Sequence, residues 1–366
     1  MKMLFFGPAT SHLRTWLTAL QQSGLEIVLL TMHRGPHAAM PFSCVDVSDV
    51  VRGKLSYFRI LPVIRRVIAA EAPDLLVSYY ASSYGFLARL SRFNPRVVVT
   101  AGSDINAYST WHAYTPLLAR VAFTGAKRVV CWSPTMRARL RELGVDGNRI
   151  FELPRGIALD AIPPRSPRTG PLRLVCTRRF SRYFNHHVLL RACRELKDRG
   201  VSFVLRLCGD GPEIDRMYRL SRDLGLIGMV DFLGELPHGE VLTLLAHSDV
   251  AVSLSSTDGA SASLFEAMAA GCYPVVSRIP PNEAWIHDRV NGRLVPFDSV
   301  ECLTAALEEI AEDPEQLAAV AERNRQFARQ HLNLRINTES YRQLFESIVA
   351  THLSSAGNTA ELPVLH

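Results

Sequence analysis

Residues 248–271 read SDVAVSLSSTDGASASLFEAMAAG, and this stretch indicates the fold of the chain. Its first part is a short apolar run, partly β-branched, that is typical of a buried parallel strand, and its last part predicts a helix that ends at Gly271. We expect Asp258 on the connecting loop and Glu266 in the first helical turn. The small residues between these two acids leave backbone N–H groups uncovered at a helix N-terminus, where an anion binds well. Such a turn suits a phosphorylated sugar.

The same loop also has a purely structural interpretation. Ser263-x-x-Glu266 fits a helix capping box, in which Glu266 accepts from the Ser263 N–H, and Asp258-Gly259 fits an ordinary turn. The wider sequence therefore has to decide between a binding loop and a simple connection.

Short apolar runs alternate with helical patterns along the whole chain, which is the signature of βαβ units and a parallel sheet. The alternation occurs twice, and it predicts strands at 2–6, 26–31, 74–78, 96–101 and 128–132, then at 173–177, 202–208, 230–234, 250–255 and 273–277. A proline-rich segment at 161–171 separates the two series and predicts a linker. We therefore expect an α/β protein with two Rossmann-like domains, at 1–160 and 172–333, and a deep cleft between them.

The composition fits a globular protein with substantial cores, since 48% of the 366 residues are hydrophobic and 21% are charged. The seven cysteines form no C-x-x-C pair, so we expect reduced thiols buried as small apolar side chains, and no metal site. No apolar run approaches the roughly 20 residues that span a bilayer, and the apolar start is too short for a signal peptide. We expect a cytoplasmic protein.

The positive charge is concentrated in the first half of the chain. Residues 1–165 contain 20 Lys and Arg against 10 Asp and Glu. A helical pattern between residues 52 and 68 combines an apolar face with Arg52, Lys54, Arg59, Arg65 and Arg66. This face could lie against anionic lipid head groups, or it could be the solvated side of a core-packed helix. Nucleic acid is not expected as a partner, because no aromatic platform accompanies the basic residues.

Ligands of doubly wound sheets bind at the carboxyl ends of the strands, here the loops that begin at Gly7, Ala101, Cys208 and Ser255. None of these loops contains a dinucleotide G-x-G-x-x-G or a phosphate-loop G-x-x-x-x-G-K-[ST] motif, so neither an NAD enzyme nor a P-loop ATPase is supported. The loop after Cys208 keeps Gly209 and Gly211, either for close approach of a base or phosphate or for a simple strand-to-helix turn.

An ordered set of motifs resembles the family-4 retaining glycosyltransferases of the GT-B fold. Asp258 to Glu266 is similar to that family's E-x7-E element, with Asp in the first place. The segments in the same order as in that family are HLRTW at 12–16, GSDI at 102–105, LGV at 143–145, PRGI at 154–157, FEAMAAGCYPVV at 265–276 and NGRLVP at 291–296. The resemblance covers nearly all of residues 1–350, and it implies a helix at 334–350 that returns to the first domain. We expect the tail at 353–366 to be disordered.

The resemblance implies a role for each matching residue. Glu266 would hold the ribose hydroxyls of a nucleotide sugar, Asp258 would meet hydroxyls of the donor sugar, and Arg179 would steady the diphosphate. Backbone N–H groups from Gly259 through Ala260, Ser261 and Ala262 to Ser263 would bind sugar and diphosphate oxygens. The remaining expected donor-binding residues are Gly211 beside the base, Gly209, Gly7, Arg178, Arg182 and Arg155.

The chain departs from the family pattern at three places. The usual lysine about five residues beyond Arg179 is absent from 181–185, which leaves the leaving-group charge to Arg179 with Arg178, Arg182 or Arg155. The usual glycine pair of the first loop is reduced to Gly7. Ala101 replaces the histidine that many members have before G-S-D, and our hypothesis is that His12 or Asp104 acts in its place.

The resemblance implies transfer of a sugar from a nucleoside diphosphate, such as a UDP- or GDP-sugar, to an acceptor hydroxyl with retention, without a metal or cofactor. A glycan or lipid-linked acceptor in cell-surface polysaccharide synthesis is our preferred substrate because the first half is basic, and peripheral contact with an anionic membrane would follow. A non-catalytic partner subunit and a GT-B sugar-nucleotide epimerase are the alternatives.

Overall fold

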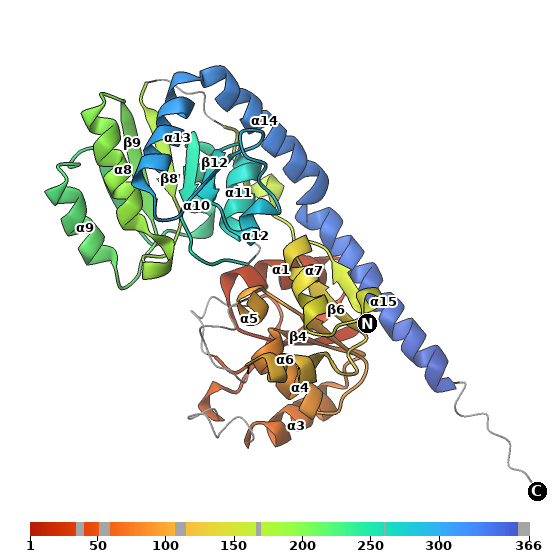
Figure 1. Cartoon of the computed structure of the whole chain (residues 1–366). Helices are drawn as coiled ribbons and strands as arrows, with labels where there is room; N and C mark the ends of the chain where they lie inside the picture. The colour runs from red at the N-terminus through yellow and green to blue at the C-terminus, as the bar shows by residue number, and fades with distance from the viewer. Residues whose placement is uncertain (34–39, 51–58, 107–114, 166–169, 260, 358–366) are drawn as a thin grey trace, which may run out of the picture. The chain divides into compact units, whose positions relative to one another are not determined.

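The computed structural model describes residues 1–33, 40–50, 59–106, 115–165, 170–259 and 261–357. The chain forms two compact units, one of Met1–Arg155 with Leu334–His366 and one of Gly156–Asn333 (Figure 1). Each unit is a parallel β-sheet covered by helices, so the predicted α/β fold with two Rossmann-like domains is confirmed.

The sheet of the first unit has seven parallel strands in the order β3-β2-β1-β4-β5-β6-β7. The strands are β1 (Lys2–Phe6), β2 (Glu26–Thr31), β3 (Ser43–Asp46), β4 (Leu75–Tyr79), β5 (Arg96–Val99), β6 (Arg128–Cys131) and β7 (Ile150–Glu152). The central strands are apolar without alternation because both faces of the sheet are covered.

Helices cover the two faces of this sheet. They are α1 (Ser11–Gln22), α3 (Leu61–Glu71), α4 (Phe86–Leu90), α5 (Ser103–Asn106), α6 (Thr115–Phe123), α7 (Pro134–Glu142) and the C-terminal α15 (Leu334–Gly357). On one face, Leu4 and Phe6 of β1 pack in a cluster with Ile64 of α3. On the other, Phe5 lies edge-on to Trp16 of α1 and Phe345 of α15, with ring centroids 5.7 and 6.4 Å away.

The sheet of the second unit has six parallel strands in the order β10-β9-β8-β11-β12-β13. The strands are β8 (Leu172–Cys176), β9 (Phe203–Cys208), β10 (Val230–Gly234), β11 (Val250–Ser253), β12 (Tyr273–Ser277) and β13 (Arg293–Val295). Leu174 of β8 belongs to the core cluster on one face, whereas Val175 belongs to the cluster on the other, as the alternation of a strand requires.

The helices of this unit are α8 (His186–Asp198), α9 (Ile214–Asp223), α10 (His238–Ala246), α11 (Ala262–Ala270), α12 (Pro280–Glu283), α13 (Val300–Glu312) and α14 (Pro314–His331). Residues of α8, α9 and α13 share the core of one face, and residues of α10 and α11 share that of the other. Helix α14 lies beside α11 (Figure 1).

All ten predicted strands are present, most of them within one or two residues of the expected bounds. Three strands were missed. β3 and β7 are short and contain charged residues, and β13 has only three residues, so none of them forms the apolar run that identifies a buried strand.

The segment 161–171, which we expected to link the two domains, belongs to the second unit, Gly156–Asn333. Arg165 donates from Nη2 to Asp249 Oδ1 at 3.0 Å and from Nη1 to the carbonyl of Gly271. Asp249 is fully buried, and it also binds the Arg173 guanidinium at 2.7 Å. These contacts attach residue 165 to the second sheet, and residues 166–169 lie outside the described part of the chain.

Three other expectations need correction or lie outside the described residues. Helix α15 continues to Gly357, so the prediction of a disordered tail from residue 353 is wrong for residues 353–357. Cys44 and Cys302 are exposed rather than buried, because each lies at the polar start of its element. Of the basic helical pattern, Arg52 and Lys54 lie outside the described residues. Arg59, Arg65 and Arg66 are exposed, while Ile64 of α3 is buried in the core. No helix in the described ranges has the length and apolarity to cross a membrane.

Candidate functional site

The second sheet has its topological switch point between β8 and β11. From β8 the chain continues to β9 on one side, and from β11 it continues to β12 on the other. The carboxyl ends of these two strands therefore form the crevice where a doubly wound sheet binds its ligand. Arg178 follows β8, and Asp258 lies in the segment 254–259 that follows β11, so the sequence-predicted residues of both segments come together here.

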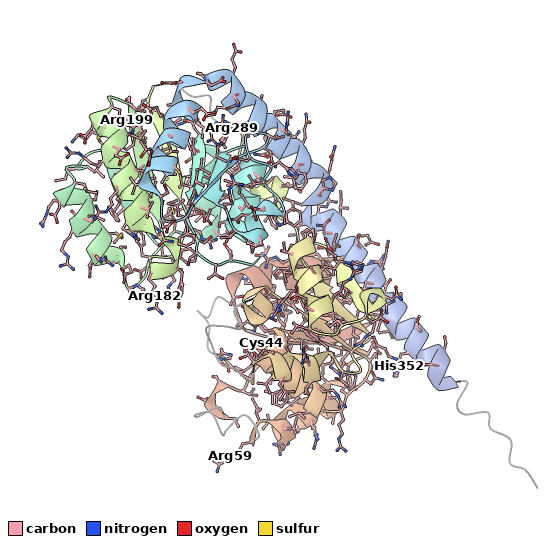
Figure 2. The ribbon with its side chains drawn as sticks, viewed as in Figure 1. Cys44, Arg59, Arg182, Arg199, Arg289 and His352 are labelled. Carbon is pink, nitrogen blue, oxygen red and sulfur yellow. The ribbon has the colours of Figure 1, made fainter. Side chains whose placement is uncertain are left out.

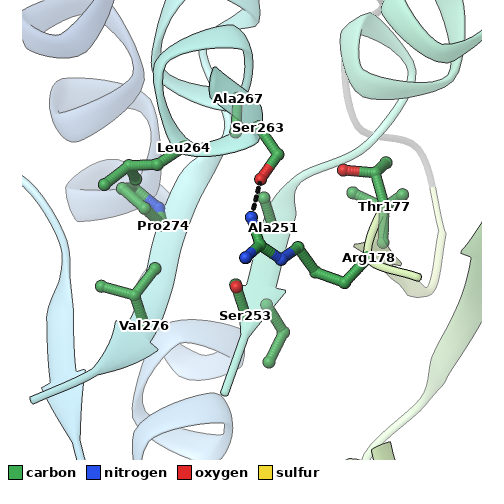
Figure 3. Close-up of a pocket in the computed structure, with 11 residues that line it drawn as sticks. Thr177, Arg178, Ala251, Ser253, Ser263, Leu264, Ala267, Pro274 and Val276 are labelled. Carbon is green, nitrogen blue, oxygen red and sulfur yellow. Dashed lines mark hydrogen bonds between the residues drawn. The ribbon is translucent and has the colours of Figure 1, made fainter. Parts of the chain in front are cut away.

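Arg178 is the central side chain of this site. Its Nη2 lies 2.6 Å from Asp258 Oδ2, and its Nη1 donates to Ser261 Oγ at 2.8 Å and to Ser263 Oγ at 2.7 Å. The guanidinium carbon lies 4.2 Å from the centroid of the Phe184 ring. Figure 3 shows Arg178 reaching across the end of the sheet to Ser263 at the start of α11, beside a small cavity. We call Arg178, Asp258, Ser261 and Ser263 the arginine cluster.

The arginine cluster is largely buried. The side chains of Arg178 and Asp258 are 12% and 16% exposed to solvent. The Nε–H of Arg178 is buried and donates to no residue in the described part of the chain. The carboxylate of Asp258 balances the charge of Arg178, so what the cluster keeps for an anionic ligand is the unused Nε–H donor at the end of the β8–β11 crevice.

Arg179, which the family pattern aligns with the diphosphate-binding arginine, has an exposed side chain. The structure brings its neighbour Arg178 to Asp258 instead. Arg182 also extends into solvent, where its guanidinium lies 5.1 Å from the ring of Tyr183 (Figure 2). Arg155 belongs to the first unit, where it lies over the ring of Trp132.

Gly209 and Gly211 bring their loop against the backbone of residues 178–180. A Cβ on Gly211 would lie 2.3 Å from the carbonyl oxygen of Phe180, and one on Gly209 would lie 2.8 Å from that of Arg178. Two hydrogen bonds fasten the contact, from Phe180 N to Asp210 O and from Glu213 N to Phe180 O. The two glycines therefore shape the segment that presents Arg178.

Glu266 lies in α11, but one turn later than expected. The helix begins at Ala262 after the N-cap Ser261, whose side chain makes no capping bond, so Glu266 is not in the first turn and forms no capping box. The residue is 5% exposed. Its Oε1 lies 2.8 Å from Nε2 of His238, the first residue of α10. Gly259 N donates to Asp258 Oδ1 at 2.8 Å, and Ala260 lies outside the described residues.

Sequence reasoning missed His238. The residue follows the carboxyl end of β10, and the signal that could have found it is a polar side chain at a helix start beyond a predicted strand. Its contact with Glu266 joins residues 28 positions apart, which no local pattern reveals.

In the first unit, Asp104 is held by backbone groups. Its carboxylate accepts from Ala81 N at 2.7 Å and from Ala101 N and Gly102 N at 3.0 Å each. Burial raises the pKa of the Asp104 carboxyl, against the opposing effect of these donors. A Cβ on Gly7 would meet Tyr79 Cβ at 2.8 Å, so this glycine permits close packing. His12 lies in the first turn of α1, and its side chain is not described.

Two family models match the chain in succession. One, described as Glycosyltransferase Family 4, matches residues 9–161, and the other, described as Glycosyl transferases group 1, matches residues 161–327. The chain belongs to the family-4, group 1 glycosyltransferases. In the segment 181–185, where the family resemblance led us to expect a lysine, Phe184 lies beneath the guanidinium of Arg178.

Curated relatives of this family member include two bacterial glycosyltransferases. WcaL of Escherichia coli, whose name connects it with colanic acid biosynthesis, is 28% identical over 68% of this chain, which spans 63% of the length of WcaL. The lipopolysaccharide core biosynthesis glycosyltransferase LpsE of Rhizobium meliloti is 27% identical over 82% of this chain and 86% of its own length. Among solved structures, HepE of Anabaena in complex with UDP and glucose has a TM-score of 0.81 at 17% identity, and the match covers 95% of this chain and all of HepE. The last similarity concerns the fold.

Proposed function

We propose that the chain transfers a sugar from a nucleoside diphosphate sugar to an acceptor hydroxyl, with retention at the anomeric carbon, in the synthesis of a cell-surface glycan or glycolipid. The observation that carries the proposal is the arginine cluster at the β8–β11 switch point, with the buried acid Glu266 one helical turn away. The names of WcaL and LpsE support the cell-surface product, and the UDP complex of HepE supports a nucleotide sugar as donor.

Arg178 would neutralise the diphosphate of this donor. A guanidinium offers several N–H donors in a plane and binds phosphate oxygens in pairs, and the buried Nε–H of Arg178 is not used by any described residue. Asp258 accepts from Arg178 and so fixes the guanidinium, while its remaining capacity is available for donor-sugar hydroxyls. Arg178 rather than Arg179 would thereby supply the charge that the missing lysine provides elsewhere in the family.

Glu266 would bind the ribose hydroxyls, because a buried carboxylate accepts strong hydrogen bonds from a diol. In the reaction, the acceptor oxygen forms a bond to the anomeric carbon while the bond from that carbon to the diphosphate oxygen breaks. The proton of the acceptor hydroxyl passes to the departing phosphate oxygen on the same face. The contribution of the protein is positioning and stabilisation of the leaving-group charge. The arginine cluster would stabilise the leaving-group charge without a divalent metal.

We further infer that the protein is cytoplasmic and makes peripheral contact with an anionic membrane.

The test is release of nucleoside diphosphate from a panel of UDP-, GDP- and ADP-sugars, with and without lipid-linked glycan acceptors. Release that depends on the acceptor supports the transferase. Release of free sugar without any acceptor would instead indicate an epimerase. A non-catalytic subunit would release no nucleoside diphosphate from any donor of the panel, and the donors would not change its unfolding temperature. EDTA treatment tests the metal independence, and co-sedimentation with anionic liposomes at low salt tests the membrane contact.

A further inference from the structure

His238 contacts Glu266, a buried acid of the proposed donor site. Its Nε2 lies 2.8 Å from Oε1 of Glu266, and the side chains are 44% and 7% exposed respectively. A carboxylate can only accept hydrogen bonds, so the Nε2 atom donates a proton into this contact. A partly exposed histidine on α10 thus contacts a buried carboxylate on α11.

The contact leaves the second carboxylate oxygen available. Within the described part of the chain, Oε2 of Glu266 accepts no hydrogen bond. The terminal torsion of a glutamate side chain has broad, weakly separated minima, so a free carboxyl group would rotate between several orientations. A donor bound to Oε1 restricts this rotation and fixes the direction in which Oε2 points.

We propose that His238 is a positioning residue that orients the Glu266 carboxylate toward the two hydroxyls of the donor ribose. The proposal rests on the proposed function, because it assumes that a nucleotide ribose reaches Glu266. A carboxylate already held in its binding orientation loses less conformational freedom when the diol arrives, and affinity rises for that reason. The imidazole also supplies a hydrogen bond that the enclosed carboxylate needs when the site is empty.

The inference predicts that His238 acts on the ribose and not on the rest of the nucleotide. We would measure by calorimetry the affinities of UDP, GDP and ADP and of their 2′-deoxy counterparts, for the full chain and for His238→Ala, His238→Gln, Glu266→Gln and the double variant His238→Ala/Glu266→Gln. The ribonucleotide should bind about 5- to 10-fold more weakly to His238→Ala, which is the range for loss of one such hydrogen bond. The 2′-deoxy form keeps only one of the two hydroxyls, so its affinity should fall by a clearly smaller factor. His238→Gln should retain most of the ribose preference because its amide donates. His238→Ala should have little effect once Glu266 is glutamine.

The outcomes separate this inference from the function on which it rests. If Glu266→Gln abolishes the preference for ribose and His238→Ala does not alter it, the function stands and the role of His238 is refuted. Equal weakening of ribo and deoxy forms by His238→Ala would also refute it, since a general disturbance of the site has that effect. If none of the six nucleotides binds, or if Glu266→Gln leaves ribose preference intact, the proposed donor site itself is wrong. His287→Ala is the matched control, because His287 is also exposed in the second unit but does not contact Glu266.

Discussion

Arg178 and Arg179 are adjacent in the sequence, but of the two, Arg178 alone contacts the described residues of the loop that carries Asp258, which we call the acid loop. Replacing Arg178 with alanine removes the cation and leaves Asp258 unpaired near the diphosphate, so nucleoside diphosphate should bind about 10- to 100-fold more weakly. Arg179→Ala is the matched control, and it should change the affinity less than 3-fold because the side chain is exposed. Titration calorimetry with UDP and GDP measures both. A larger effect at Arg179 than at Arg178 would contradict the assignment.

His186 gives the second unit a dependence on pH. Its imidazole is 3% exposed and stacks on Phe180 with ring centroids 4.4 Å apart. Burial lowers the pKa of His186 to about 4. Between pH 6.5 and 4 the unfolded chain therefore binds more protons than the folded one, so the free energy of unfolding falls as the pH is lowered through this window, by roughly 3 kcal/mol for this residue.

Substitution of His186 with phenylalanine should remove this part of the pH dependence, since phenylalanine keeps the stacking and does not titrate. Urea unfolding followed by circular dichroism at pH 7, 5.5 and 4.5 measures the difference. His287→Gln, at an exposed position, should keep the pH slope of the wild-type chain. An unchanged slope in His186→Phe would show that the buried imidazole is not the group responsible.

The loop between β9 and α9 determines the position of the segment after β8. In Gly211→Ala, the new Cβ would meet the carbonyl oxygen of Phe180 at 2.3 Å, and the φ of 153° is unfavourable for alanine. The backbone of residues 178–180 must then move, and Arg178 with it. We expect a loss of about 1 to 3 kcal/mol in the free energy of unfolding and weaker nucleotide binding. Gly239→Ala, which places a methyl group in open space on α10, should not lower the stability. Comparison of the two by urea unfolding checks the prediction, and similar stabilities would contradict it.

The strands and the acid loop were predictable because their signals are local. β-branched runs identify the buried strands, and Gly271 ends α11 with a φ of 79°, as a left-handed C-cap requires. The choice between Arg178 and Arg179 was not predictable, because the bend after β8 depends on hydrogen bonds to the loop at 210–213, about thirty positions later. The environment of Asp104 was not predictable either, because one of the three backbone N–H groups that bind its carboxylate belongs to Ala81, which is distant in the sequence.

Across the whole chain, burial divides the seven thiols into two classes. Cys44 and Cys302 are exposed, and the other five are buried. Burial raises the pKa of Cys131 and Cys272 to about 12 and that of Cys176 to about 11, so these thiols form little of the reactive thiolate near neutral pH.

A disulfide reagent such as dithiobisnitrobenzoate should therefore react rapidly with two thiols of the folded protein and with all seven in guanidinium chloride. Of the two, Cys44 should react more slowly, because partial burial and Asp46 raise its pKa. Each of the two units has its own core, and each contributes one exposed cysteine, Cys44 in the first and Cys302 in the second. The double variant Cys44→Ser/Cys302→Ser should show no rapid reaction until it unfolds. Progressive release of further thiols with denaturant would then report the unfolding of the two units, because Cys131 lies in the first and the other buried thiols lie in the second. Rapid reaction of more than two thiols in the folded chain would show that at least one of the cores is open to the reagent.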